Sequence, residues 1–187
     1  MMRSSMIKKW DVLNSEQLVS NNIFSVKKDR SVSPITGNEH DFFILEAPDW
    51  INVVALTEND EIVLIEQYRH GTQSVTIEIP GGMVDPGEEP LQTAKRELLE
   101  ETGYAGENWL QIGEVFPNPA IQNNRCFSFL ATNCKKVGDT NFDTTEDIFT
   151  YTKPHTEISK LVSQGKITHS LVVAAFYWYA LYKQSNI

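Results

Sequence analysis

Residues 82–104 read GMVDPGEEPLQTAKRELLEETGY, and this stretch decides how the chain folds. Pro90 is well placed for the first turn of a helix, and Gly103 for the left-handed position just after its last turn. We therefore predict a helix over residues 90–102. Its apolar residues recur at helical spacing and form one stripe, made of Leu91, Ala94 and Leu98. That stripe predicts the face by which the helix packs against a sheet.

Glutamates gather on another face of the predicted helix. Glu97, Glu100 and Glu101 stand at i, i+3 and i+4, a spacing that places side chains on one face. Like charges so placed repel each other, so a solvated acidic face gains nothing from them. A divalent cation bound between the carboxylates turns this repulsion into attraction, because Mg²⁺ takes oxygen ligands and bridges carboxylates to phosphates. A metal site is therefore favoured over a plain acidic surface.

The whole stretch also has a known spacing. Gly82, five residues, Glu88, seven residues and then Arg96-Glu97-Leu98-Leu99-Glu100-Glu101-Thr102-Gly103-Tyr104 fill every specified position of the Nudix box. The sequence therefore resembles the Nudix hydrolases. This resemblance implies an α+β protein with the Nudix fold, an α/β/α sandwich around a mixed central sheet. It also implies hydrolysis of a pyrophosphate bond with Mg²⁺ as the cofactor and Mn²⁺ as a substitute.

The resemblance implies roles for the residues of the box. Glu97 and Glu101 are expected to bind the metal directly, and Glu100 directly or through water. The backbone carbonyl of Gly81 is a further expected ligand, and Glu100 and Glu101 also count as catalytic. The remaining motif positions are expected to be structural: Gly82, Glu88, Arg96 and Gly103. For Arg96, an ion pair that ties helix to loop is favoured over a direct functional role, because guanidinium suits a bidentate carboxylate contact.

Segments outside the box narrow the resemblance to one branch, the ADP-ribose and nucleoside diphosphate sugar pyrophosphatases. They are Gln67-Tyr68-Arg69, Glu78-Ile79-Pro80-Gly81-Gly82, and Pro119, which lies sixteen residues after Gly103. The expected substrate is thus a nucleoside diphosphate sugar, cleaved to a nucleoside monophosphate and a sugar phosphate.

Substrate-binding residues are expected at Arg69, Glu78, Pro119 and Arg125. The guanidinium of Arg69 matches phosphate oxygens, with a plain surface arginine as the alternative. Glu78 is a candidate for the base edge or the ribose, or else a structural partner of Arg69. Arg125 either meets a phosphate or ends a loop. One aromatic ring should stack on the base, and Trp10, Phe24 and Trp50 stay open as candidates.

The general base is expected outside the box. In the branch a glutamate on a late loop does this work, and residues 143–147 hold that place here. We choose Glu146, with a solvated acidic loop as the alternative. The four histidines are scattered without the spacing of a zinc site.

The N-terminal part resembles the extra sheet of the same branch. We expect residues 1–50 to form a small antiparallel sheet, exchanged between the subunits of a homodimer, and residues 51–187 to form the Nudix domain. Hydrophobic runs predict the strands, at 23–26, 41–45, 51–56, 62–65, 109–116, 125–131 and 148–152. Two further helices are predicted, at 156–164 and 170–184.

Charge and composition exclude several classes of partner. The 187 residues include 25 acids and 16 bases, for a net charge of −9, which disfavours nucleic acid and anionic membranes. The longest apolar run, 171–182, is shorter than the roughly 20 residues that a bilayer requires. With two cysteines and no secretory segment, a reduced cytoplasmic location is expected.

Alternatives remain within and outside this class. Within the class, the alternative substrates are another sugar nucleotide, such as GDP-mannose or UDP-glucose, and a dinucleotide such as NADH. A Nudix-fold binding module without catalysis is the alternative from another class. Such modules usually lose acids of the box, and this chain keeps Glu88, Glu97, Glu100 and Glu101.

Overall fold

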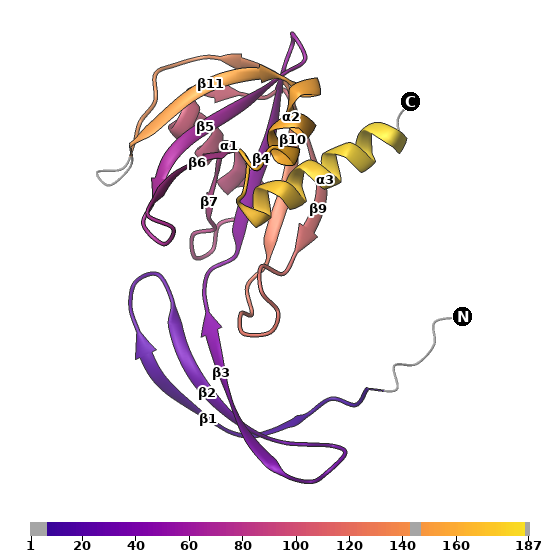
Figure 1. The fold of residues 1–187 in the computed structure, drawn as a ribbon. Helices are drawn as coiled ribbons and strands as arrows, with labels where there is room; N and C mark the ends of the chain where they lie inside the picture. The colour runs from indigo at the N-terminus through magenta and orange to yellow at the C-terminus, as the bar shows by residue number, and fades with distance from the viewer. Residues whose placement is uncertain (1–6, 143–146, 186–187) are drawn as a thin grey trace. The chain divides into compact units, whose positions relative to one another are not determined.

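The computed structural model describes residues 7–142 and 147–185. The chain divides into two compact units (Figure 1). The first comprises Met1–Pro48 and Asn118–Asn124, and the second Asp49–Pro117 and Arg125–Ile187. The first unit therefore includes a short segment from the middle of the chain, tied to its third strand by the Leu45 N–H bond to the Ile121 carbonyl.

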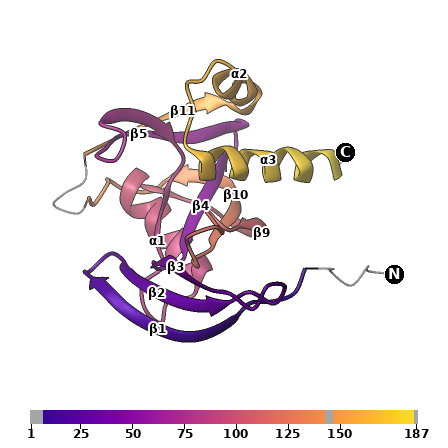
Figure 2. The ribbon, with the colours of Figure 1, turned by 60° about the horizontal axis from the view of Figure 1, so that its bottom comes forward.

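The first unit is a curved antiparallel sheet in the order β1-β2-β3 (Figure 2). Its strands are β1 (Asp11–Ser20), β2 (Ser25–Val32) and β3 (Glu39–Glu46). All ten residues of β1 are exposed, and among the described residues of this unit no hydrophobic side chain is buried. The sequence predicted parts of β2 and β3 but not the length of β1, because β1 has no buried face to give it a hydrophobic pattern.

The second unit contains an eight-stranded mixed sheet with the central order β11-β5-β4-β10-β8. Strands β6, β7 and β9 pair with β5, β4 and β10, and the β4–β10 pair is parallel while its other pairs are antiparallel. The strands are β4 (Trp50–Thr57), β5 (Glu61–Arg69), β6 (Ser74–Glu78), β7 (Gly81–Met83), β8 (Tyr104–Ala105), β9 (Asn108–Val115), β10 (Cys126–Lys136) and β11 (Ile148–Pro154). These pairings confirm the predicted α+β class with a mixed central sheet.

Both faces of this sheet are covered, which explains why its central strands read as continuous hydrophobic runs. Along β4, Ile51, Val53 and Ala55 face one core, while Val54 faces a second core on the other side. On one face lies α1 (Pro90–Thr102), whose Ala94 and Leu98 are fully buried in the first of these cores. The predicted stripe of the helix therefore packs where the sequence placed it.

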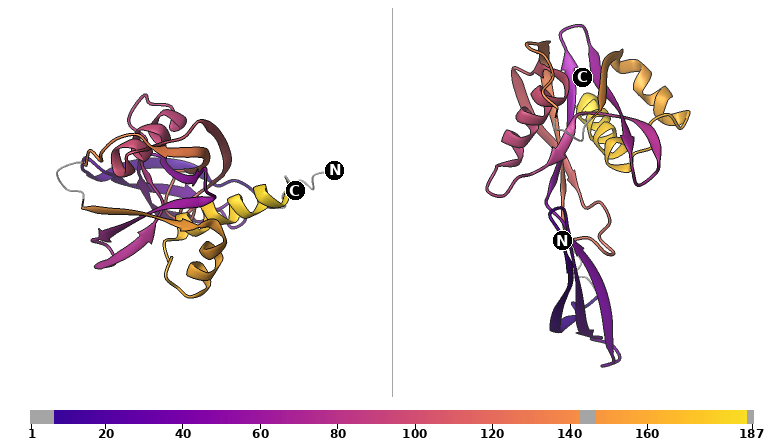
Figure 3. Two further views of the ribbon diagram at one scale, coloured as in Figure 1. Left: turned by 90° about the horizontal axis from the view of Figure 1, so that it is seen from above. Right: turned by 90° about the vertical axis from the view of Figure 1, so that its left-hand side faces the viewer.

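The other face carries the C-terminal helices (Figure 3, right). They are the 3₁₀ turn η1 (His155–Glu157), α2 (Ile158–Ser163) and α3 (Ser170–Ser185). Helix α3 lies close to β9, since a Cβ placed on Gly113 would overlap the ring of Trp178. The predicted helix at 156–164 is shorter in the structure, where its first turn is 3₁₀. Among the described residues, no helix is long and apolar enough to cross a membrane.

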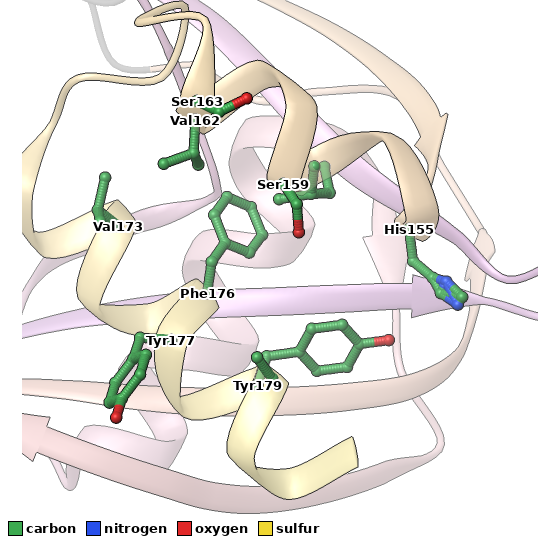
Figure 4. A pocket seen from close by; sticks show the side chains of 10 residues that line it. His155, Ser159, Val162, Ser163, Val173, Phe176, Tyr177 and Tyr179 are labelled. Carbon is green, nitrogen blue, oxygen red and sulfur yellow. The ribbon is translucent and has the colours of Figure 1, made fainter. Parts of the chain in front are cut away.

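An apolar hollow of about 380 Å³ lies between α2 and α3 (Figure 4). Phe176 and Tyr179 line it from α3, and Ser159 and Val162 from α2. The exposed ring of Tyr177 also borders it. This hollow includes none of the residues that the sequence singled out for chemistry.

Candidate active site

Strand β7 places Gly81 and Gly82 against the acidic face of α1. Gly81 pairs with Asn52 of β4, and its N–H donates to Glu101 Oε2 at 2.9 Å. A Cβ at position 81 would lie 2.6 Å from Asn52 Oδ1 and would also overlap the carbonyl of Ile51. The strand pairing therefore requires a glycine there. Glu101 is 3% exposed, so its carboxylate is almost completely shielded from water where it contacts this backbone.

A glycine is required at position 82 for a different reason. A Cβ at this position would lie 2.5 Å from Glu97 Cδ, well inside ordinary contact. The Glu97 carboxylate thus lies directly against the backbone of β7, and its side chain is mostly buried. Gly81 and Gly82 together let two carboxylates of α1 approach β7.

Arg96 forms ion pairs with several of the acidic side chains of the box. Its guanidinium is 2.8 Å from Glu97 Oε1, 3.1 Å from Glu100 Oε2 and 3.1 Å from Glu88 Oε2. Asp85 is a more distant partner, at 3.7 Å. The pKa of Arg96 lies above its ordinary value, with the hydrogen bond to Glu88 as the largest cause. The arrangement is the ion pair between loop and helix that we favoured for Arg96.

Glu88 faces the same guanidinium from the loop side. It accepts hydrogen bonds from Arg96 and from Thr93 Oγ1, the latter at 2.8 Å. The Arg96 hydrogen bond is also the main reason why the pKa of Glu88 lies below its usual value. Glu88 therefore anchors the loop to the first half of α1 in its charged form.

The last turn of α1 is connected to two later segments. Gly103 adopts φ 72° and ends the helix, and its carbonyl accepts the N–H of Val137 at 2.8 Å. The Asn141 N–H donates to the Glu100 carbonyl at 2.9 Å, and Thr150 Oγ1 donates to the Glu101 carbonyl at 3.1 Å. Glu146, our candidate base, lies between these two attachments but outside the described residues.

Arg69 and Glu78 form a bidentate ion pair across the β5–β6 hairpin. Arg69 Nε and Nη2 donate to the two carboxylate oxygens of Glu78, each at 2.7 Å, and Thr76 Oγ1 donates to Glu78 Oε1 at 2.6 Å. Glu78 is 2% exposed. Burial alone would raise the pKa of Glu78, but the hydrogen bonds from Arg69 and Thr76 outweigh it and hold that pKa below its usual value. The structure thus realises the alternative in which Glu78 is the structural partner of Arg69.

A hollow of about 230 Å³, which we call the box hollow, brings the predicted metal and phosphate residues together. Its lining includes Gly81 from β7, Glu97 and Glu101 from α1, and Arg69 from the end of β5. A larger hollow of about 350 Å³ shares Trp50 and Arg69 with it. Carboxylates and a guanidinium therefore border one space, as handling of a phosphate with a bound cation requires.

The oxygen donors of the box hollow fit a hard divalent cation such as Mg²⁺ in chemical type. Within residues 7–142 and 147–185, however, no three His, Cys, Asp or Glu side chains form a ready metal-binding group. In the structure Arg96 lies against Glu97 and Glu100, and Glu101 is hydrogen-bonded to Gly81. A bound metal ion would be held by Glu97, Glu101 and the carbonyl of Gly81. Glu100 lies on the exposed side of the cluster.

Neither Pro119 nor Arg125 lines the box hollow. Pro119 belongs to the first unit. Arg125 precedes β10, where its N–H and side chain contact the carboxylate of Asp49 and its guanidinium lies 4.9 Å from the centre of the Phe127 ring. Of the open aromatic candidates, Trp50 lines both hollows, while Trp10 and Phe24 belong to the first unit.

Sequence reasoning gave no role to several residues around Arg69. Thr76, Thr168 and His169 line the larger hollow, and Gln67 lines the box hollow. Gln67 stands in the QYR segment and carried a signal. His169 carried none, because only the fold brings the start of α3 to the end of β5.

Comparisons with known proteins agree with the family that the sequence motif predicted. The NUDIX domain family matches residues 48–170, which is more than half of the chain, and the chain therefore belongs to the Nudix family. This match confirms the predicted family and, with it, the predicted class of enzyme, a pyrophosphohydrolase.

Individual relatives lie in the predicted branch. The chain is 29% identical over 170 residues to the ADP-ribose pyrophosphatase of Mycobacterium tuberculosis, covering 88% of this chain and 80% of that protein. It is 35% identical over 88 residues to the ADP-ribose pyrophosphatase of Bacillus subtilis, covering 47% and 48%. A crystal structure of an ADP compounds hydrolase is similar in fold, with a TM-score of 0.86 over 98% of both chains at 20% identity.

Proposed function

We propose that this protein hydrolyses the pyrophosphate bond of ADP-ribose, or of a closely related nucleoside diphosphate sugar, with Mg²⁺ as its cofactor and Mn²⁺ as a substitute. One observation carries the proposal: Glu97, Glu101, Gly81 and Arg69 border a single hollow. The relatives named ADP-ribose pyrophosphatase support the choice of substrate.

The reaction adds water across one P–O–P bridge. The oxygen of water attacks one phosphorus, the bridging bond of that phosphorus breaks, and the departing phosphate carries the bridging oxygen. When bound, Mg²⁺ neutralises phosphate oxygens and makes the attacking water more acidic. Without a cation, the carboxylates of Glu97 and Glu101 would repel a pyrophosphate. This repulsion explains why an acidic site needs a bound cation.

Residues of the chain then have distinct tasks. Glu97, Glu101 and the Gly81 carbonyl hold the cation, and Glu100 contributes directly or through water. The guanidinium of Arg69 is fixed by its bidentate contact with Glu78 and presents a positive charge beside the box hollow. Because Glu78 already fixes one side of Arg69, little side-chain freedom is lost when a phosphate binds.

We keep Glu146 as the proposed general base. The chain on either side of residues 143–146 is hydrogen-bonded to the last turn of α1, through Asn141 and Thr150. A base must lie within hydrogen-bond reach of the attacking water, and these attachments support a base from this segment. Arg125 and Pro119 stay candidates for substrate contacts outside the box hollow.

The first unit supports a homodimer in which residues 1–50 pack on the partner subunit. A three-stranded sheet needs a hydrophobic face packed against something to be stable. The exposed apolar side chains of β1 include Val12, Leu13, Leu18 and Val19. Light scattering in dilute buffer should give the mass of two chains, and a monomer mass would refute this proposal. A cytoplasmic location is part of the same proposal.

The function is tested by phosphate release coupled to a phosphatase. The substrates are ADP-ribose, GDP-mannose, UDP-glucose and NADH, each with Mg²⁺, with Mn²⁺ and with EDTA. We expect the highest kcat/KM for ADP-ribose and no turnover in EDTA. Absence of turnover with all four substrates, while Mg²⁺ binding is detected by calorimetry, would refute the enzyme assignment.

Two variants test the base. Glu146→Gln should lower kcat about 10²- to 10⁴-fold, the usual contribution of a general base, while Mg²⁺ binding stays the same. The matched control is Glu157→Gln, an exposed acid at the start of α2, which should leave kcat unchanged. Wild-type turnover in the Glu146→Gln enzyme would remove this residue from the mechanism.

A further inference from the structure

The larger hollow differs chemically from the box hollow that it adjoins. It has a volume of about 350 Å³, and its lining combines the indole of Trp50 and the guanidinium of Arg69 with threonine and histidine side chains. The polar residues are Thr72, Thr76, Thr168, His70 and His169. The box hollow instead is lined by acids and arginines, and the two share Trp50 and Arg69. A molecule that occupies both would have a charged part at the box and an uncharged, hydroxyl-rich part beside Trp50.

The hydroxyls and imidazoles of the larger hollow can both donate and accept hydrogen bonds. Thr76 Oγ1 donates to Glu78, and Thr72 Oγ1 lies 2.9 Å from Ser74 Oγ, so both oxygens keep the capacity to accept from a ligand. Sugar hydroxyls are likewise donors and acceptors, whereas a nucleobase has a larger plane and no hydroxyl. An indole adds a flat apolar surface, which suits the apolar face of a sugar ring.

His169 lines the larger hollow together with Trp50 and Arg69. Its Nδ1 is buried and has no hydrogen-bond partner within the part of the chain that the structure describes. Burial, with Arg69 nearby, lowers the pKa of His169 despite the opposing effect of Glu78, so its imidazole is neutral at pH 7. As a residue that lines the hollow, His169 can offer a ring nitrogen to a bound hydroxyl, because a neutral imidazole has one donor and one acceptor.

We propose that this larger hollow binds the sugar half of the nucleoside diphosphate sugar, with Trp50 against the sugar ring and His169 hydrogen-bonded to a sugar hydroxyl. The pyrophosphate then lies beside Arg69, which borders both hollows. This inference rests on the proposed function and adds the residues that select the sugar. Trp50 and His169 are substrate-binding residues in this scheme and take no part in proton transfer.

The two reaction products identify which half of the substrate the hollow holds. Ribose 5-phosphate and AMP are each used as inhibitors of ADP-ribose hydrolysis, in the wild-type enzyme and in the variants Trp50→Ala and His169→Ala. We expect the inhibition constant of ribose 5-phosphate to rise about tenfold in each variant, the effect of losing one good contact. That of AMP should change less than about twofold. The variant His169→Gln, which keeps a donor and an acceptor, should recover part of the loss.

Tyr177→Ala is the matched control, because it removes an exposed aromatic ring beside the other hollow, between α2 and α3. It should leave both inhibition constants unchanged. A larger rise for AMP than for ribose 5-phosphate in Trp50→Ala would overturn the proposal in favour of a nucleoside site. Unchanged constants for both products would show that the hollow holds no part of the substrate.

Failure of the proposed function would be seen separately, as absence of turnover by the wild-type enzyme. In that case NMR titration of ribose 5-phosphate and AMP into the wild-type and His169→Ala proteins decides the inference without catalysis. Ribose 5-phosphate binding that weakens in His169→Ala supports it. Binding of neither product, or equal binding to both proteins, overturns it.

Discussion

Gly82→Ala is the substitution that most directly tests the proposed metal site. A Cβ at position 82 would lie 2.5 Å from Glu97 Cδ, whereas ordinary contacts begin at 3.4 Å. The carboxylate must therefore retreat by 3.4 − 2.5, or about 0.9 Å. Metal–oxygen distances tolerate only about 0.2 Å, so a retreat of this size removes Glu97 from a position suited to the metal.

The expected loss follows from that displacement. Misplacing a group by about 1 Å can cost about 10²-fold in rate, so kcat/KM for ADP-ribose should fall about 10²-fold, or about 2.7 kcal/mol. Folding stability should change by less than about 1 kcal/mol, because the end of a flexible side chain gives way and the backbone at 82 is not left-handed. Coupled phosphate release over a Mg²⁺ titration and urea unfolding measure the two effects.

Two further glycines serve as comparisons. In Gly81→Ala the added Cβ would overlap backbone atoms of β4. The substitution should therefore lower stability by about 1–3 kcal/mol through a shift of the β7–β4 pairing. Gly138→Ala meets nothing within 4 Å and should change neither activity nor stability. If Gly82→Ala keeps wild-type kcat/KM and Mg²⁺ dependence, the position of the Glu97 carboxylate is not required, and the proposed ligand set is wrong.

The remaining predictions concern stability and reactivity. Arg69→Met should lower the free energy of unfolding by about 3 kcal/mol at pH 7, because it leaves the buried Glu78 carboxylate without its partner; a loss under about 1 kcal/mol in urea would contradict this. The lowered pKa of Glu78 contributes stability above its unfolded value of 4.5, which is lost as pH falls through the folded pKa. The deficit of Arg69→Met in the free energy of unfolding should therefore shrink as pH falls below 4.5, and a deficit that stays constant with pH would argue against the linkage. Cys126 and Cys134 should resist thiol reagents at pH 8 until urea unfolds the protein, since burial raises the pKa of each to about 12, and rapid labelling of the native protein would disprove it. Gly103→Ala should cost about 1–2 kcal/mol because φ there is 72°, and an unchanged melting temperature would refute that cost.

Local signals predicted the catalytic helix well. Its bounds, Pro90–Thr102, agree with the sequence prediction, because the starting proline, the terminal glycine and the apolar stripe all act within a few residues. The side-by-side position of Glu97 and Glu101 followed from helical periodicity in the same way. The box therefore could be predicted before any fold was known.

Contacts between distant segments could not be predicted in this way. Whether Arg69 meets a phosphate or Glu78 depends on the register of the β5–β6 hairpin, which pairs Ile65 with Glu78. The place of His169 depends on how α3 packs across the sheet, a property of the whole core. The length of strand β1 could not be predicted because all of its residues are exposed.

The two adjoining hollows also bear on how such a protein can change over time. The box hollow takes most of its lining from β7, the following loop and α1, whereas the larger hollow takes most of its lining from the β5–β6 turn and the residues before α3. The segments that break the bond are thus largely separate from those that meet the rest of the substrate. Substitutions around the β5–β6 turn can alter which sugar is accepted while the catalytic helix stays as it is, so one reaction can be inherited intact while its substrates diverge.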